Sequence, residues 1–485
     1  MSMSGRRPFD TSPGARVIGF ARSCGFAILV TSLAGCIPSA DLPDPALDVP
    51  DTFRASGPGK PADAPRVDWW VSFRTPELTG FMEETALANL DIAAAAARII
   101  QADANARVTG AVLFPLINAV DSVTRSRQPA LSTTNVTERT VYLTSFTASY
   151  EIDFWRKNES ALRAAEQSAF ASRWDRETIA ITALAGTANT YFAILSARER
   201  LRYVNENLRA ATRILDLIKE RVTVGTATAL DQAQQESLVA NVRATIPPLK
   251  QIADQNVATL AVLLGRAPER LTVAGSAVTA VGLPRVSPGL PSDVLLQRPD
   301  IQFAEAQLLS ANASLQSARA AFFPSIQLTA QGGWQSLALQ SLFSPSSAFY
   351  SVAAGLTQPI FDGGRLYGAF DQQKGRQEEF LANYRKSVIS AFSDVERALV
   401  ALQQLAQQEE LLRQALAASR RAYEISEVRL REGTVDIVSV LQTQQTLFTA
   451  QDTLLQVRLS RLQAAVALYQ ALGGGWAHLR LGSHI

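Results

Sequence analysis

The sequence predicts a mainly α-helical chain that carries four membrane β-strands, and three observations lead to this fold class. An internal repeat divides the 485 residues into two related copies, instead of the three unrelated domains that the length alone suggests. Each copy contains a helical pattern far longer than a globular domain holds. Each copy also contains two segments in which apolar and polar residues alternate, as they do in membrane strands.

The repeat consists of matching residues at a nearly constant spacing. Asp153 and Arg156 match Asp362 and Arg365, 209 positions later, and Arg221 matches Arg429, 208 positions later. Leu90-Asp91-Ile92 with Pro299-Asp300-Ile301, Gly225 with Gly433, and Leu264-Gly265 with Leu472-Gly473 extend the match. The expected segments are a signal peptide (1–35), a tether (36–68), a first repeat (69–265), a linker (266–290), a second repeat (291–475) and a tail (476–485).

Long helices dominate both copies. A helix is expected over 76–108, long helices over 156–223 and 366–431, and return helices over 227–264 and 435–471. About 67 residues at about 1.5 Å each give a helix of about 100 Å, which only a long bundle or coiled coil accommodates. Pro247 and Pro248 interrupt the first return helix, and the second has no proline at the matching place. We therefore expect a kink in the first copy only.

Four strands are expected, near 111–125, 138–152, 325–334 and 348–360. In the third strand Ile326, Leu328 and Ala330 alternate with polar residues. A soluble sandwich with one solvated face would alternate in the same way, but lipid leaves no sheet edge unpaired, and four strands cannot close a barrel. Several chains must then share one barrel. Phe114-Pro115 and Phe323-Pro324 mark the expected helix-to-strand corners, with Pro115 inside the first strand.

The composition excludes most catalytic designs. The only histidines are His478 and His484, and the cysteines are Cys24 and Cys36, so residues 37–477 contain neither type. This excludes a zinc site of histidine and cysteine, a cysteine nucleophile and a histidine-based triad. Catalysis by carboxylates alone remains open. The net charge is +2, and no basic region indicates a nucleic-acid partner.

The N-terminus has the pattern of an export signal. A basic segment precedes the apolar run Gly25–Val30 and the small residues that end in Leu33-Ala34-Gly35-Cys36. This ending resembles the bacterial lipobox, which implies a diacylglyceryl thioether on Cys36 and no other cofactor. The alternative is an ordinary buried cysteine. Ile37 in place of aspartate favours release to the outer membrane, and the proline-rich residues after it indicate an extended tether.

Several motifs together resemble the TolC-like outer membrane factors, in particular their lipoprotein (NodT) branch. The motifs are Gly289–Ile301, Ala311–Ser314, Ala318–Ile326, Pro359–Arg365, Arg431–Thr434 and Leu468–Trp476. The resemblance implies a homotrimer with a shared twelve-stranded outer-membrane barrel and a hollow periplasmic tunnel of helices. It also implies the exit duct of a tripartite efflux pump, with a periplasmic adaptor and an inner-membrane transporter as partners, and no enzyme activity.

The resemblance also implies two functional regions. The adaptor would dock at the hairpin turns, marked by Arg221, Gly225, Arg429 and Gly433, although plain helix termination explains the same residues. The periplasmic aperture would be lined from the start of the last helix, with Val438 as one candidate. Gln442 and Gln445 align with the family's charged gate positions. Either this gate is hydrogen-bonded and apolar, or Asp231 or Asp436 supplies the charge. A solvated face of a coiled coil would explain each of these residues equally well.

Two other functions are consistent with parts of the pattern. A lipid-anchored coiled-coil scaffold without a pore would need no barrel strands. A surface-attached enzyme would need paired carboxylates, and no such pair is evident. The cargo is not specified by the sequence, although Met82 is the one methionine after residue 3, which argues against a methionine or histidine relay for copper or silver.

Overall fold

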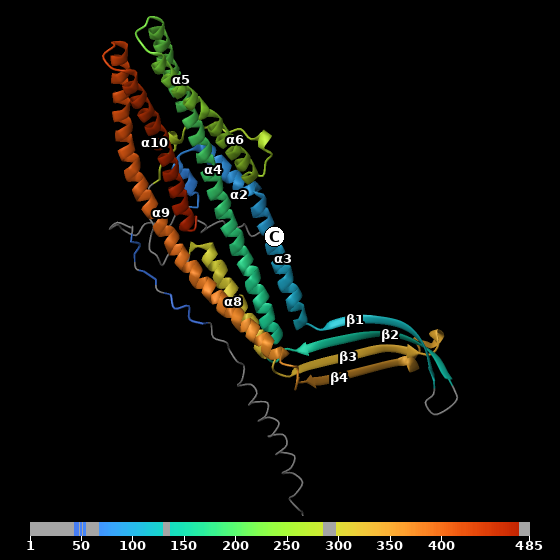
Figure 1. Ribbon diagram of the computed structural model, residues 1–485. Helices are drawn as coiled ribbons and strands as arrows, with labels where there is room; N and C mark the ends of the chain where they lie inside the picture. The colour runs from blue at the N-terminus through green and yellow to red at the C-terminus, as the bar shows by residue number, and fades with distance from the viewer. Residues whose placement is uncertain are drawn as a thin grey trace, which may run out of the picture. The chain divides into compact units, whose positions relative to one another are not determined.

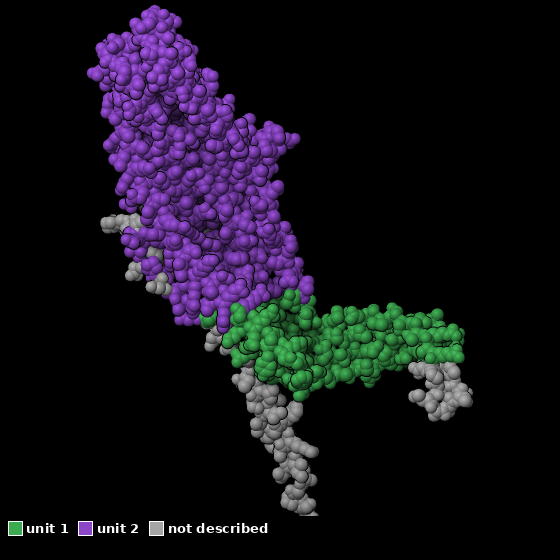
Figure 2. Space-filling model, in the orientation of Figure 1, with its two compact units in different colours: residues 1–43, 109–164, 311–375 green, residues 44–108, 165–310, 376–485 purple. Residues whose placement is uncertain are grey.

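The computed structural model describes residues 43–47, 49–50, 52–54, 67–129, 136–284 and 297–474 (Figure 1). The expected signal peptide, Cys36, both histidines and parts of the tether and linker lie outside these residues. The described chain forms two compact units (Figure 2). Of the described residues, unit 1 contains 43 and those within 109–164 and 311–375, and unit 2 contains those within 44–108, 165–310 and 376–474.

Unit 1 contains one antiparallel sheet with the strand order β1-β2-β3-β4 (Figure 1). The strands are β1 (Leu116–Pro129), β2 (Val136–Ile152), β3 (Ser325–Ser336) and β4 (Ala348–Thr357). The first strand begins after Pro115, so the prediction that it starts near 111 with Pro115 inside was wrong. Residues Ala111–Leu113 instead form a 3-10 turn, η2. Strand pairing begins only after Pro115, because proline has no N–H to donate to a neighbouring strand.

The register places a row of apolar residues from all four strands on one face, and the opposite face carries Leu116, Val120, Val141, Leu143 and Phe349. Ile326 pairs with both Ile152 and Leu356, and Leu328 pairs with both Tyr150 and Ala354. Tyr350 and Val352 of β4 are 87% and 78% exposed, so this face is not covered by the rest of the described chain. The pair Asp121 and Thr144 interrupts the apolar face. The predicted alternation is confirmed, because paired residues of neighbouring strands point to the same side.

The corners of unit 1 are built from repeat-related residues. Asp153 accepts hydrogen bonds from the backbone N–H groups of Asn158 and Glu159, which start helix α4 (Lys157–Thr223). Asp362 accepts hydrogen bonds from the backbone N–H of Gly364, which directly precedes α9 (Arg365–Arg431), and from that of Leu366 in its first turn. These backbone bonds hold the pKa of Asp362 below its ordinary value. At each corner the carboxylate therefore satisfies orphan donors of a long helix.

Unit 2 is built of helices. Its elements are η1 (Trp69–Phe73), α2 (Pro76–Ala88), α3 (Leu90–Gly110), α5 (Ala229–Ala244), α6 (Ile246–Leu263), the short η3 (Pro268–Arg270) and η4 (Val278–Ala280), and α10 (Ile437–Ala471), with most of α4, α8 (Pro299–Ala320) and α9. The loop between β3 and β4 holds η5 (Leu339–Ser341) and η6 (Pro345–Ser347) in unit 1. The main core packs Phe73, Leu78 and Phe192 with Leu260 and Leu462.

The long helices follow the sequence prediction, with one exception. Helices α4 and α9 each have 67 residues. The return helix of the first copy breaks at Thr245 before Pro247 and Pro248, whereas α10 runs unbroken, so the predicted kink is confirmed. The expected single helix over 76–108 is instead two helices, α2 and α3. Asn89 separates them, because its side-chain oxygen accepts from the N–H groups of Asp91 and Ile92.

A second bond from Asn89 has its counterpart in the other copy. The Asn89 amide donates to the Leu263 carbonyl at the end of α6, at 2.9 Å. At the repeat-related place Arg298 donates to the Ala471 carbonyl at the end of α10, at 3.0 Å. Each copy thus fastens the start of its strand-leading helix to the end of its return helix. The repeat is therefore present in tertiary contacts as well as in the sequence.

Within the described chain, one helix is long and apolar enough to cross a membrane. It is α4, but 61% of its most apolar window is buried against the rest of the protein. A helix of this kind also serves as the core of a helical bundle, and the buried Tyr191, Phe192 and Ile194 give it that role here.

Gly333 provides a test of the sheet register. A Cβ at this position would lie 2.1 Å from the Thr144 carbonyl oxygen and 2.5 Å from the Ser145 Cα. We expect Gly333→Ala to destabilise the folded protein by about 1–3 kcal/mol, because backbone atoms of β2 must move. The measurement is the fraction of folded protein in detergent, from circular dichroism during urea unfolding.

Gly332→Ala is the matched control for this experiment. Its nearest neighbour would be the Phe349 carbonyl oxygen at 3.8 Å, an ordinary contact. We expect this variant to unfold like the wild type. Equal unfolding of the Gly333→Ala protein and the wild type would contradict the register of β2 and β3.

Candidate functional site

The two hairpin turns of unit 2 have the same backbone geometry. After α4, Gly225 has φ +75°, its N–H bonds to the Val222 carbonyl, and the Thr226 N–H bonds to the Arg221 carbonyl. After α9, Gly433 has φ +74°, with equivalent bonds to Leu430 and Arg429. This pattern is the Schellman motif, which uses glycine because a positive φ strains other residues. The turns are thus rigid structures of fixed shape.

The return helices begin with carboxylate and hydroxyl groups in exchanged order. Thr228 caps α5 and forms a capping box with Asp231, three residues later. Asp436, at the position matching Thr228, caps α10 by accepting from the Ser439 N–H at 2.8 Å. The hydrogen bonds from Ser439 hold the pKa of Asp436 below its ordinary value. Both aperture candidates with a carboxylate are therefore helix caps.

Arg221 joins the two hairpins. Its guanidinium donates to the Leu430 carbonyl at 2.5 Å and to the Arg431 carbonyl at 3.1 Å, at the C-terminal end of α9. Beneath this bond Ile214 and Ile218 of α4 pack with Tyr423, Leu430 and Val440. A positive side chain at a helix C-terminus is favourable, because the last carbonyls carry partial negative charge.

A groove lies between the hairpin tips. Its volume is about 510 Å³. Its lining includes the Arg221 contact and both cap carboxylates, and the residues are Ile218, Arg221, Thr226, Ala227, Asp231, Leu430, Arg431, Glu432, Gly433, Val435, Asp436 and Ile437. The groove brings Arg221 and Gly433 together with Asp231 and Asp436. Gly225 and Arg429 are exposed and do not line it.

The remaining aperture candidates share one face of α10. Val438, Gln442 and Gln445 are exposed and are spaced by four and three residues, which places them along one side of the helix. The opposite side carries Val440 and Leu447, which are buried against α4 and α9. The candidate residues thus form a stripe of one apolar and two amide side chains that no described residue covers.

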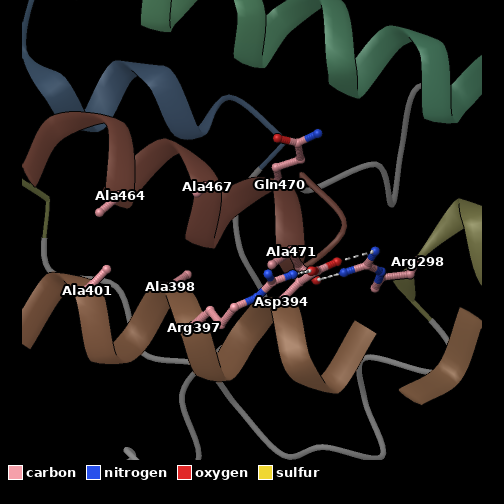
Figure 3. Close-up of a pocket in the computed structure, with 9 residues that line it drawn as sticks. All are labelled: Arg298, Asp394, Arg397, Ala398, Ala401, Ala464, Ala467, Gln470 and Ala471. Atoms are coloured by element: carbon pink, nitrogen blue, oxygen red, sulfur yellow. Dashed lines mark hydrogen bonds and ion pairs between the residues drawn. The ribbon is translucent and has the colours of Figure 1, made fainter. Parts of the chain in front are cut away.

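A second groove lies between α9 and α10, with alanines along both sides (Figure 3). At its end Asp394 bonds to Arg298 at 3.3 Å and to Arg397 at 3.0 Å. Burial alone would lower the pKa of Arg298, but its bonds to Asp300 and the charges of Asp300 and Asp394 raise it. Arg298 also holds the end of α10 through the Ala471 carbonyl. Arg298 lies within the motif Gly289–Ile301, but the sequence pattern does not mark it as a site residue.

A buried carboxylate on α9 binds one arginine of its own helix and two arginines of α10. Glu409 is 2% exposed and accepts hydrogen bonds from Arg413, Arg458 and Arg461. Arg458 also donates to the Val281 carbonyl in the linker at 2.6 Å. Burial lowers the pKa of Arg458 despite the opposite charge of Glu409. The contact spans 177 residues of sequence, so no local pattern could have indicated it.

The described part of the tether is fastened to unit 2. Phe53 is 4% exposed and packs with Ile301, Val388 and Leu468. Arg385 on α9 donates to the Pro45 carbonyl at 2.7 Å and to the Asp44 carbonyl at 3.1 Å. The tether was expected to be extended, and the packing of Phe53 is an addition to that expectation. Phe53 is the only aromatic residue of the tether, and this isolated aromatic residue is the feature of the sequence that could have indicated its packing.

Among the described residues, no group of three or more histidine, cysteine, aspartate or glutamate side chains is placed to hold a metal ion.

Comparison with known proteins agrees with this architecture. The family model described as "Outer membrane efflux protein" matches residues 82–266 and again 290–474. The pyoverdine export outer membrane protein OpmQ of Pseudomonas aeruginosa is 40% identical over 93% of this chain and 96% of its own length. The toluene efflux pump outer membrane protein TtgF of Pseudomonas putida is 35% identical over 87% and 88%.

A solved structure of a membrane protein from Pseudomonas aeruginosa has the same fold. It superposes with a TM-score of 0.84 at 29% identity and covers 92% of this chain and 99% of its own. With the duplicated helical hairpins, the four-stranded sheet and the twofold family match, the chain belongs to the outer membrane efflux protein family and is an efflux channel of the outer membrane.

Proposed function

We propose that this chain is one third of a lipid-anchored exit duct. Three copies share a twelve-stranded barrel, and their helices form a periplasmic tunnel that a periplasmic adaptor joins to an inner-membrane transporter. The observation that carries the proposal is the open sheet, in which an apolar face is combined with two strand edges, β1 and β4, that have no partner in the described chain. Lipid cannot satisfy such edges, so other copies must.

The hairpin tips support a docking site for the adaptor. Their turns are fixed by Schellman motifs, and the groove between them offers Arg221 and Arg431 beside Asp231, Glu432 and Asp436. A groove with both charge signs and a preformed shape suits a protein partner, because complementary charges set register and orientation. We place the adaptor contact at these turns, where Gly225 and Gly433 allow the close approach of another backbone.

The aperture is proposed to be lined by amide and valine side chains of α10 instead of by the two carboxylates. Asp231 and Asp436 are held at the starts of α5 and α10 by their hydrogen bonds with Thr228 and Ser439. Val438, Gln442 and Gln445 form the exposed stripe of α10. Amide side chains from three copies can hydrogen-bond to one another and to water, and valine adds an apolar constriction.

The cargo is proposed to be organic, and the duct to perform no chemistry of its own. The relatives OpmQ and TtgF are named for pyoverdine and toluene. Met82 is fully buried, so its thioether cannot contact a solute passing along a duct. Histidine and cysteine are missing from residues 37–477, and the residues that soft metal ions prefer are therefore scarce.

The aperture proposal is tested by opposite charges at one position. We expect Gln442→Glu to shift the ion selectivity of the channel towards cations and Gln442→Lys to shift it towards anions, because three copies place three charges at the narrowest point. The measurement is the reversal potential in planar bilayers under a salt gradient. Because the two variants differ mainly in the sign of the added charge, each controls for the other.

Two outcomes of that experiment would count against the proposals. Unchanged selectivity in both variants, with conductance present, would remove Gln442 from the aperture. No conductance from any variant, including ones with alanine at Val438, Gln442 and Gln445, would favour a lipid-anchored scaffold without a pore.

The lipid anchor is tested at the two native cysteines. We expect Cys36→Ser to remove the lipid mass from the protein, because serine has no thiol to form the thioether. Mass spectrometry of the purified protein measures the change. Cys24→Ser is the control and leaves the mature mass unaltered, because Cys24 departs with the signal peptide. An unlipidated mature wild type would contradict the anchor.

A further inference from the structure

Repeat-related residues of this chain make repeat-related contacts. The helix caps Asp153 and Asp362 correspond, and so do the Schellman turns at Gly225 and Gly433. The bond from Asn89 to the end of α6 has its mate in the bond from Arg298 to the end of α10. Several contacts made within one copy thus have a counterpart in the other copy.

The Arg221 contact is different, because it joins one copy to the other. Arg221 of the first copy donates to Leu430 and Arg431 of the second. Its mate would run from Arg429 to Val222 and Thr223, which lie 208 positions before Leu430 and Arg431. Within the described chain Arg429 is exposed, and no hydrogen bond or ion pair of its side chain is found. Each chain has two hairpins, and one side of each hairpin already faces the other through the Arg221 contact. An Arg429 contact on the remaining side would therefore need a hairpin from another chain.

The acceptor and the surrounding surface show the same asymmetry. The Leu430 carbonyl accepts both the Gly433 N–H and Arg221, whereas among the bonds of the turn the Val222 carbonyl accepts only the Gly225 N–H. Leu217, one turn before Arg221, packs into the apolar cluster between the hairpins. Its mate Ile425, one turn before Arg429, is 56% exposed. Arg429 and Ile425 are thus exposed where their counterparts Arg221 and Leu217 pack between the hairpins.

We propose that Arg429 binds the end of α4 in a second copy of this chain, donating to the carbonyls of Val222 and Thr223 there. The inference rests on the proposed trimer and adds a defined contact to it. Six hairpins then form a ring in which three Arg221 contacts lie within chains and three Arg429 contacts lie between chains. Each arginine stabilises a neighbouring helix C-terminus, where a cation is favoured.

Thiol cross-linking tests this contact. The pair Arg429→Cys and Thr223→Cys is treated with a flexible bis-maleimide of about the length of an arginine side chain, in the full-length protein in membranes. We expect dimer and trimer bands on denaturing gels. The in-chain pair Arg221→Cys and Arg431→Cys is the matched control, and we expect it to give only monomer-sized product. The single-cysteine variants supply the background.

A second experiment compares the thermal dissociation of the wild-type trimer with that of Arg429 variants. We expect Arg429→Ala to lower the temperature at which the detergent-solubilised trimer dissociates, and Arg429→Lys to restore part of the loss. Arg421→Ala is the control, because Arg421 is an exposed arginine on the same helix with no side-chain partner in the described chain. A dissociation temperature unchanged by Arg429→Ala but lowered by Arg421→Ala would contradict the proposed contact.

The outcomes separate this inference from the proposed trimer. A trimer by light scattering that gives no cross-linked bands from the Arg429→Cys and Thr223→Cys pair would overturn the Arg429 contact and leave the trimer standing. A monomer by light scattering would overturn the trimer, and the contact with it.

Discussion

The structure depends most on the hydrogen-bonding demand of backbone groups in lipid. A peptide N–H or carbonyl without a partner in hydrocarbon costs several kcal/mol, so a membrane sheet must close on itself. This chain provides four strands in the order β1-β2-β3-β4 and leaves both edges open. Closure then requires other chains, and a barrel shared between copies requires their helical hairpins to stand side by side. The exposed apolar face and the two open edges are the features expected of one part of a closed barrel.

The internal repeat explains why several contacts of this chain occur in pairs. Contacts made inside one copy appear twice, as the bonds from Asn89 to Leu263 and from Arg298 to Ala471 show. The two copies also differ at two places that affect their helices. Proline breaks only the first return helix, and the acid and hydroxyl of the helix starts are exchanged between Thr228-Asp231 and Asp436-Ser439. A ring of related but unequal hairpins can present two kinds of groove to a partner, which a ring of identical hairpins cannot.

The parts of the fold that could be predicted from sequence are those with a local cause. The 67-residue helices follow from unbroken periodicity, their ends from Gly225 and Gly433, and the kink from Pro247 and Pro248. The break at Asn89 was missed because alanine-rich helix surrounds a cap that only its hydrogen bonds reveal. The links through Arg298 and Glu409 were missed because their partners are distant in the chain, and burial of charge depends on packing. Of the candidate site, sequence located the hairpin turns, whereas the cap roles of Asp231 and Asp436 required the structure.

Electron cryo-microscopy of the full-length protein in lipid nanodiscs would reveal whether several copies share one barrel. We expect threefold-symmetric density in which β4 of each copy pairs with β1 of the next, so that twelve strands close one barrel. A monomeric particle, or a trimer in which each four-stranded sheet remains separate, would contradict the shared barrel.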